Sequence, residues 1–241
     1  MRQTELLLNI GFAVEAVREG APVVQCIAPR EATAFVADVL YAAGARPVVT
    51  GTSPEALAAL AHSDALVVDL GTLSVEGSEG LTDAISKAAG GELRWVLDAS
   101  RLGRAGIRFD RVQGLVSLRP AVVRVLADDL DDLRLNAHGG ALVVTSDSEE
   151  VSLGDRVLQG SAGAARLRQI AGVRAAVSAL TAACSSVADP LVAAVAASAW
   201  MSEASKRADE QSSGPASFRV ALVDALAQVR GDEVALALMN A

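Results

Sequence analysis

Ala65-Leu-Val-Val-Asp-Leu-Gly-Thr-Leu73 is the stretch that decides the fold. Its apolar run ends at the carboxylate Asp69, and Gly71 and Thr72 follow two and three residues later. An apolar run of this length, bounded by turn residues, predicts a strand that is buried on both faces. Trp95-Val-Leu-Asp98 repeats the pattern, and a helical pattern over about 76–89 separates the two runs. Strand, helix and strand in this order predict a right-handed βαβ unit within a parallel sheet.

The same alternation extends to both sides of this unit. Upstream, the patterns predict strands at 22–27 and 47–49, and helices at 4–19, at 31–43 and from Ser53 onward. Downstream, they predict strands at 115–118 and 141–145, a helix that begins at Pro120, and a hairpin over 150–158 around Gly154-Asp155. The rest is helical and rich in alanine, at 171–187, 190–210, 215–230 and from Asp232 onward. Because we find neither an internal repeat nor a linker, we expect residues 1–241 to form a single α/β domain.

Composition and charge exclude several classes of function. Hydrophobic residues make up 51% of the chain and aromatic residues only 3%, so Ala, Val and Leu must fill a sizeable core. The net charge of −8 repels polyanions, so we expect no nucleic-acid partner. Cys26 and Cys184 have no neighbours at metal-ligand spacing and are predicted to be inert buried thiols. We recognise neither a signal peptide nor a bilayer-spanning run, so we expect a cytoplasmic protein without a membrane partner.

Polar residues follow several of the predicted strands. In a parallel sheet, ligands bind at the carboxyl ends of the strands, so these residues are candidates for a binding site. A carboxylate at a strand end can equally be the cap of the next helix. The candidates are Asp69, Gly71, Thr72, Asp98, Arg119 and Thr145.

Seven stretches, in order along nearly the whole chain, carry a family resemblance. They are Ala43-Gly-Ala-Arg-Pro47, the Ala65–Leu73 stretch, Trp95-Val-Leu-Asp98, Ser117-Leu-Arg-Pro-Ala-Val-Val-Arg124, Val143-Val-Thr145, Ile170-Ala-Gly172 and Ser213-Gly-Pro-Ala-Ser-Phe218. The ordered set resembles the hydroxyethylthiazole kinase family, thiamine-salvage enzymes of the ribokinase-like group. The resemblance implies a ribokinase-like three-layer α/β/α fold with a central, mostly parallel sheet and an Ala-rich helical C-terminal part. It also implies ATP-dependent phosphorylation of a thiazole alcohol by a homotrimer whose substrate site lies between subunits.

The resemblance also assigns roles to residues of this sequence. Arg124 and Thr145 match the family's contacts to ATP, while Asp98 and Asp129 match residues that help to hold magnesium. The thiazole alcohol is expected near Val49 and Gly172. Asp69 and Gly71, at the end of the third predicted strand, complete the substrate-binding set.

The sequence departs from the family most clearly at Gly172-Val-Arg-Ala175, where the family reads Gly-Thr-Gly-Cys. Glycines there let N–H groups at a helix start approach the transferred phosphate, and the Cys lies where a base or orienting group is needed. Cβ atoms at Val173 and Arg174 would penalise any positive φ in this turn, and Ala175 has no proton-accepting group. Arg174 could offer its charge to an anion, or the segment could simply be the first turn of a packed helix.

Three hypotheses of function follow. The first is a kinase of the family, which uses ATP and Mg²⁺ on a thiazole alcohol. The second is a catalytically inactive relative that binds a small ligand without nucleotide, and the third is a structural or regulatory subunit of an oligomer. Changes after Asp98 and Arg124, and a short connection between Asp129 and Ala141, favour a divergent site on a retained core.

Overall fold

The computed structural model describes residues 3–28, 30–50, 58–70, 81–82, 85–86, 93–100, 112–130, 139–146, 148–160 and 163–239. The strands are β1 (Val23–Ile27), β2 (Arg46–Thr50), β3 (Ala65–Asp69), β4 (Arg94–Asp98), β5 (Val122–Leu126), β6 (Ala141–Thr145), β7 (Glu149–Leu153) and β8 (Arg156–Gly160). They form one eight-stranded sheet in the order β2-β1-β3-β4-β5-β6-β7-β8. Strands β1 to β6 are parallel, and β7 and β8 add an antiparallel hairpin beside β6. The mostly parallel central sheet is therefore confirmed.

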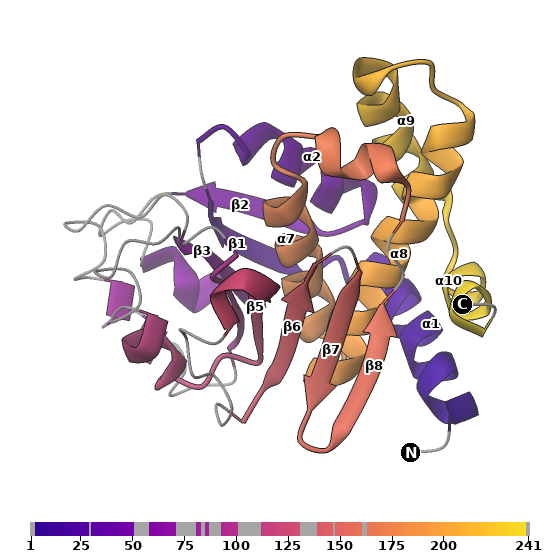
Figure 1. Cartoon of the computed structure of the whole chain (residues 1–241). Helices are drawn as coiled ribbons and strands as arrows, with labels where there is room; N and C mark the ends of the chain where they lie inside the picture. Colours follow the sequence, from indigo (N-terminus) through magenta and orange to yellow (C-terminus); the bar gives the residue numbers. More distant parts are fainter. Residues whose placement is uncertain are drawn as a thin grey trace.

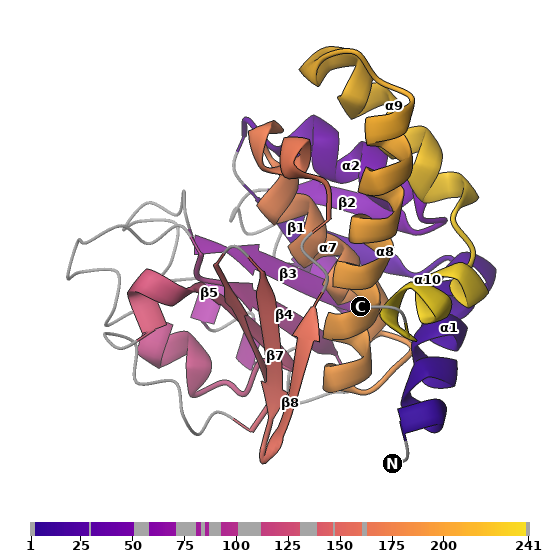
Figure 2. The ribbon, with the colours of Figure 1, turned by 45° about the vertical axis from the view of Figure 1, so that its right-hand side comes forward.

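The described helices cover the sheet, and most of the longer ones lie on one face (Figures 1 and 2). They are α1 (Gln3–Gly20), α2 (Thr33–Ala42), α7 (Val173–Ser185), α8 (Pro190–Glu210), α9 (Pro215–Gln228) and α10 (Gly231–Met239), with 3-10 turns η1 (Ala59–His62), η4 (Ala127–Asp129) and η5 (Ala165–Gln169). Successive residues of a strand point to opposite faces. Ala65 and Val67 of β3 accordingly join the core under α2, α7 and α8, while Leu66 and Val68 join a second core on the other face. The arrangement is the three-layer α/β/α fold, with the Ala-rich helical C-terminal part that we expected.

Alanine in α7 and α8 lets these helices lie close to the sheet. Every residue of α7 from Ala175 to Ser185 is buried. The start of α8 is fixed by its sequence, because the Asp189 carboxylate accepts hydrogen bonds from the N–H groups of Leu191 and Val192, each at 3.1 Å. Pro190 occupies the first helical turn, where its missing N–H costs nothing. In the described part of the chain, none of the helices combines the length and the hydropathy needed to cross a membrane.

Two predictions for the segment before β5 were wrong. Residues 112–116 are helical and 117–118 form a turn, so 115–118 is not a strand. Leu115 packs into the core on the face away from α7. Arg119 then takes a left-handed conformation (φ 57°), and Pro120 leads into β5 rather than into a helix. Arg119 therefore lies at the amino end of a strand, not at the carboxyl end that binds ligands.

The other predicted elements agree with the structure where it describes them. The hairpin turns at Gly154-Asp155, and the helices from 171 onward and the strands at 65 and 141 are present. The segment after Ser53 is described only from residue 58, where it continues into η1, and the helix expected over 76–89 lies mostly outside the described residues. The single domain over residues 1–241 stays a prediction.

Candidate functional site

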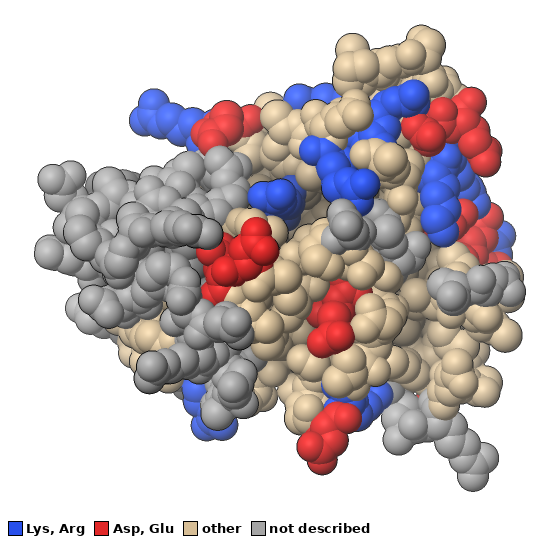
Figure 3. Space-filling model, in the orientation of Figure 1, with Lys and Arg blue, Asp and Glu red and all other residues tan. Residues whose placement is uncertain are grey.

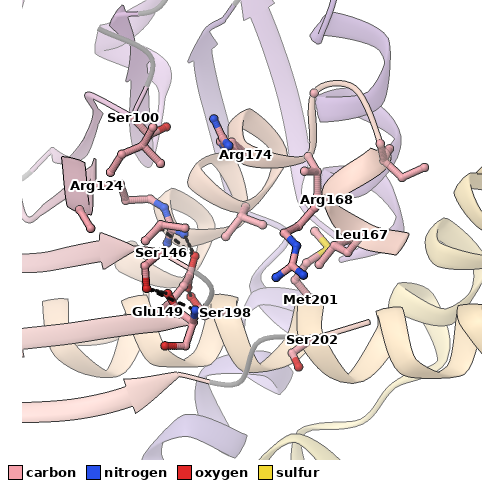
Figure 4. Close-up of a pocket in the computed structure, with 18 of the residues that line it drawn as sticks. Ser100, Arg124, Ser146, Glu149, Leu167, Arg168, Arg174, Ser198, Met201 and Ser202 are labelled. Carbon is pink, nitrogen blue, oxygen red and sulfur yellow. Dashed lines mark hydrogen bonds and ion pairs between the residues drawn. The ribbon is translucent and has the colours of Figure 1, made fainter. Parts of the chain in front are cut away.

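A cavity of about 570 Å³ opens at the carboxyl ends of the central strands. Its walls come from the ends of β5 and β6, the beginning of β7, the turn η5, the first turn of α7 and one side of α8. Figure 4 shows Arg124 and Glu149 at one side of this cavity, Arg174 at its edge and Arg168 on the other side. The position is the one that ligands occupy in open parallel sheets.

Strand register brings the predicted polar residues together on one face. Asp69 of β3 pairs with Asp98 of β4, and Asp98 pairs with Arg124 of β5. Thr145 of β6 pairs with Leu126, two residues beyond Arg124. Because each of these four polar residues is an even number of positions from a residue of the core under α7 and α8, all four face those helices.

Asp98 is fully buried, and both of its carboxylate oxygens accept hydrogen bonds. Oδ1 accepts from the backbone N–H of Ser100 at 2.9 Å and from the Ser100 hydroxyl. Oδ2 accepts from the hydroxyl of Ser178 on α7 at 2.6 Å. Ser100 lines the cavity and Asp98 does not, so the aspartate orients a serine that a ligand can reach.

Arg124 and Glu149 form the most buried ion pair of the cavity wall. Nη2 of Arg124 donates to Oε1 of Glu149, and the two side chains are only 5% and 16% exposed. The hydroxyl of Thr145 also donates to Oε1, at 3.4 Å, while the hydroxyl of Ser198 on α8 donates to Oε2. Glu149 thus ties two strands and a helix together (Figure 4). Nη1 of Arg124 is buried and has no hydrogen-bond partner among the described residues.

Helix α7 begins at the cavity with a turn that needs one glycine. Gly172 has φ +86° and ψ −3°, and a Cβ there would lie 3.2 Å from the Cα of Ala32. Neither Val173 nor Arg174 has a positive φ, so the strain that we expected from their Cβ atoms does not arise. The first N–H groups of a helix have no intrahelical acceptor, and no side chain caps this helix start. The N–H of Val173 donates to the carbonyl oxygen of Ile170 at 3.3 Å, while Ala175 is buried and does not line the cavity.

Charge in the cavity is mostly positive. Arg168 on η5 and Arg174 on α7 line it, and so does Asp128, an exposed carboxylate on η4. The charges of Arg124 and Glu149 cancel within their pair. Figure 3 shows basic side chains beside a hollow near the middle of this face, with acidic side chains on its lower side. The described lining residues include three arginines and two carboxylates, so in a chain with a net charge of −8 this cavity has an excess of positive charge that favours an anionic ligand.

The structure brings some of the predicted site residues to the cavity and not others. Those that line it are Arg124, Thr145, Gly172 and Arg174. Asp69, Asp98 and Ala175 lie buried nearby without lining it, Val49 is half-buried on the edge strand β2, and Asp129 is half-buried beside Asp128. Gly71 and Thr72 lie outside the described residues.

Several lining residues were not predicted from the sequence. They are Ser100, Asp128, Glu149, Arg168 and Ser198. The predicted hairpin begins at residue 150, one position after Glu149, and only the pairing of β7 with β6 places Glu149 opposite Thr145. Ser198 lies in an apolar alanine run, and nothing in that pattern indicates a cavity.

The carboxylates of the site suit a magnesium ion that is bound partly by the substrate, because they do not form a complete set of metal ligands by themselves. Among the described residues there is no group of three His, Cys, Asp or Glu side chains that could hold a metal. Mg²⁺ is usually bound by one or two carboxylates together with substrate phosphates and water. Asp128 lines the cavity and could supply such a carboxylate, whereas both oxygens of Asp98 already accept hydrogen bonds.

Comparison with solved structures first defines the class of fold. A ribokinase-like superfamily protein from Enterococcus faecalis superposes with a TM-score of 0.59 at 12% identity, over 86% of each chain. A hydroxyethylthiazole kinase from Pyrococcus horikoshii superposes with a TM-score of 0.85 at 26% identity, over 92% of this chain and 93% of that one. The fold is therefore ribokinase-like.

Sequence comparison narrows the class to one family. The sequence model of the Hydroxyethylthiazole kinase family matches residues 14–139 and 136–232, so the chain belongs to this family. The hydroxyethylthiazole kinase of Cronobacter sakazakii is 30% identical over 88% of this chain and 90% of its own length. That of Clavibacter sepedonicus is 32% identical over 91% of this chain and 89% of its own length. The resemblance seen in the sequence is confirmed.

Proposed function

We propose that this protein is a cytoplasmic kinase that transfers the terminal phosphoryl group of ATP to the hydroxyl group of hydroxyethylthiazole. One observation carries the proposal beyond family membership. A cavity at the strand ends combines an uncapped helix start at Gly172 with the guanidinium groups of Arg124, Arg168 and Arg174. Catalysis of phosphoryl transfer is mostly positioning and electrostatic stabilisation of phosphate oxygens, and this cavity offers both.

The proposed reaction transfers one phosphoryl group between two oxygen atoms within the cavity. The substrate hydroxyl oxygen forms a bond to the terminal phosphorus while the bond from that phosphorus to the bridging oxygen breaks, and ADP leaves with the bonding electron pair. The first turn of α7 and the arginines hold the phosphate oxygens through N–H donors. Mg²⁺, held by Asp128 and phosphate oxygens, would supply additional positive charge there.

The hydroxyl proton needs an acceptor that Ala175 cannot provide. The Ser100 hydroxyl lines the cavity and already donates its hydrogen to Asp98 Oδ1. Ser100 can therefore accept the substrate proton on its oxygen while its own hydrogen passes to Asp98. The hydrogen bond from Ser178 holds the other carboxylate oxygen in place during this step. The pair Ser100 and Asp98 takes over, in this proposal, the task of the family's missing Cys.

The family resemblance also supports a homo-oligomer, and we propose a trimer. Large apolar side chains are exposed on α1 and α10, which pack side by side (Figures 1 and 2). Phe12 is 67% and Met239 63% exposed, and Leu8 and Leu236 are more than half exposed. Such a group of exposed apolar side chains is typical of an interaction surface. Sedimentation velocity should give a trimer mass; a monomer at micromolar concentration would contradict this part of the proposal.

The test of function is a turnover assay on the purified protein. With Mg-ATP and hydroxyethylthiazole, mass spectrometry should detect the phosphate ester together with an equal amount of ADP. Asp98→Asn should lower kcat because Ser100 loses its proton acceptor, and Glu150→Gln, on an exposed residue outside the cavity, should leave kcat unchanged. Thermal stabilisation by the thiazole without ester or ADP would favour the inactive, ligand-binding relative instead.

A further inference from the structure

Arg174 is a cation at the cavity that has no partner within the described protein. It is the second residue of α7, its side chain is exposed, and it forms no ion pair or side-chain hydrogen bond with a described residue. Other arginines outside the cavity do have carboxylate partners: Arg166 pairs with Asp209 and Arg207 with Glu233. An unpaired guanidinium at a ligand cavity is available to bind an anion bidentately.

Arg174 lies in the first turn of α7, at the end of the helix that attracts anions. The helix start carries partial positive charge, although the N–H of Val173 donates to the carbonyl oxygen of Ile170 at 3.3 Å, and no side chain of the cap residue Gly172 competes for the first turn. Gly172 supplies the positive φ of the turn, so Val173 and Arg174 follow in ordinary helical conformation. Adding a side chain at position 174 has therefore not disrupted the turn, and has placed a cation beside the N–H donors.

A second, independent observation also indicates an anion at this place. Arg124 lies on the β5 side of the same cavity (Figure 4), and its side chain is only 5% exposed. One of its nitrogens, Nη1, is buried without an acceptor in the described structure. A buried donor without an acceptor costs free energy that a bound anion can recover. Glu149 uses Nη2 and leaves Nη1 to be satisfied by something else.

We infer that Arg174 is a catalytic residue of this chain: its guanidinium binds the distal phosphates of the nucleotide, in the place where the family uses glycine N–H groups. This inference rests on the proposed function, which supplies the nucleotide. In it, the guanidinium of Arg174 donates to the phosphate in place of the glycine N–H groups that the sequence lacks at this turn. The guanidinium binds the distal phosphate oxygens and stabilises the charge on them during transfer. Arg124 Nη1, on the β5 side of the cavity, then donates to the same anion.

The experiment compares three nucleotides and four proteins by titration calorimetry with Mg²⁺. The nucleotides are AMP, ADP and a non-hydrolysable ATP analogue, because AMP lacks the distal phosphates. The variants are Arg174→Met, Arg174→Lys and, as the matched control, Arg156→Met, which removes an exposed arginine on β8 outside the cavity. Arg174→Met should weaken binding of the ATP analogue by roughly 10- to 100-fold, the effect of losing charge-assisted hydrogen bonds, while AMP binding stays unchanged. The affinity of Arg174→Lys for the ATP analogue should lie between those of the wild type and Arg174→Met, and the affinity of Arg156→Met should equal that of the wild type.

Each outcome decides the inference separately from the proposed function. If Arg174→Met binds the ATP analogue more weakly but the wild type makes no thiazole ester, then Arg174 does bind the phosphates and the proposed substrate is wrong. If the wild type makes the ester and Arg174→Met binds and turns over ATP equally well, the inference is overturned and the function stands. Arg174→Gly adds an opposite expectation: a gain in kcat on restoring the family's glycine would also overturn the inference. A wild type that binds none of the three nucleotides would overturn both.

Discussion

Removing the charge of Glu149 should destabilise the protein more than the substitution of an exposed residue. Its carboxylate is the described counter-ion of the buried Arg124 and also accepts hydrogen bonds from Thr145 and Ser198. Breaking one partner of a buried ion pair typically costs about 3–5 kcal/mol, because the other charge stays buried without compensation. For a chain of this size, about 2–4 °C of melting temperature accompanies each kcal/mol, so Glu149→Gln should lower the melting temperature by roughly 6–20 °C.

The assay is thermal and urea unfolding of Glu149→Gln beside Glu150→Gln. Glu150 is the next residue on the same strand, points to the other side and is exposed, so its variant should stay within about 0.5 kcal/mol of the wild type. A third protein, Glu149→Leu with Arg124→Met, removes both charges and should be more stable than Glu149→Leu alone. Equal unfolding free energies for Glu149→Gln and the wild type would refute the argument that Glu149 holds the wall together.

Three further predictions concern the turn, the thiols and acid stability. Gly172→Ala should cost about 1–2 kcal/mol in urea unfolding, because alanine disfavours φ +86° and its Cβ would press on Ala32; an unchanged midpoint would show that the turn can relax. Burial raises the pKa of Cys184 to about 12 and raises that of Cys26 as well, so a thiol reagent at pH 8 should label neither in the native protein and both in denaturant. The backbone N–H of Arg230 and the Arg207 guanidinium lower the pKa of Glu233, so its contribution to stability is present above its ordinary pKa and lost as pH falls through the folded one. Glu233→Gln should therefore flatten the acid side of the stability–pH curve, and an unaltered slope would contradict the assignment.

The sheet could be predicted from the sequence wherever an apolar run was long and isolated. The runs at Ala65–Asp69 and Ala141–Thr145 are strands because β-branched and aliphatic residues fill both faces of a buried parallel sheet. The errors lie at 115–126, where short apolar runs carry no clear period. The sequence predicts a helix start at Pro120, but the fixed φ of proline suits the approach to a strand equally well, and Val122 and Val123 favour the strand.

The candidate site could be predicted as far as it follows from strand ends. Arg124 and Thr145 line the cavity because parallel strands end at the same edge of the sheet. Glu149 required the pairing of β7 with β6, and Ser198 required the packing of α8 against that hairpin; neither is fixed by local pattern. The prediction of strain at Val173 and Arg174 was wrong because only Gly172 takes a positive φ in this turn. The side-chain requirements of a turn depend on which of its residues is left-handed, and the sequence alone did not show that.

The most direct measurement is a crystal structure of the protein with Mg²⁺ and a non-hydrolysable ATP analogue. The account predicts that the triphosphate lies in the cavity against the first turn of α7, with distal phosphate oxygens within hydrogen-bond distance of the guanidinium groups of Arg174 and Arg124. A triphosphate bound elsewhere on the protein, with Arg174 directed to solvent, would contradict it.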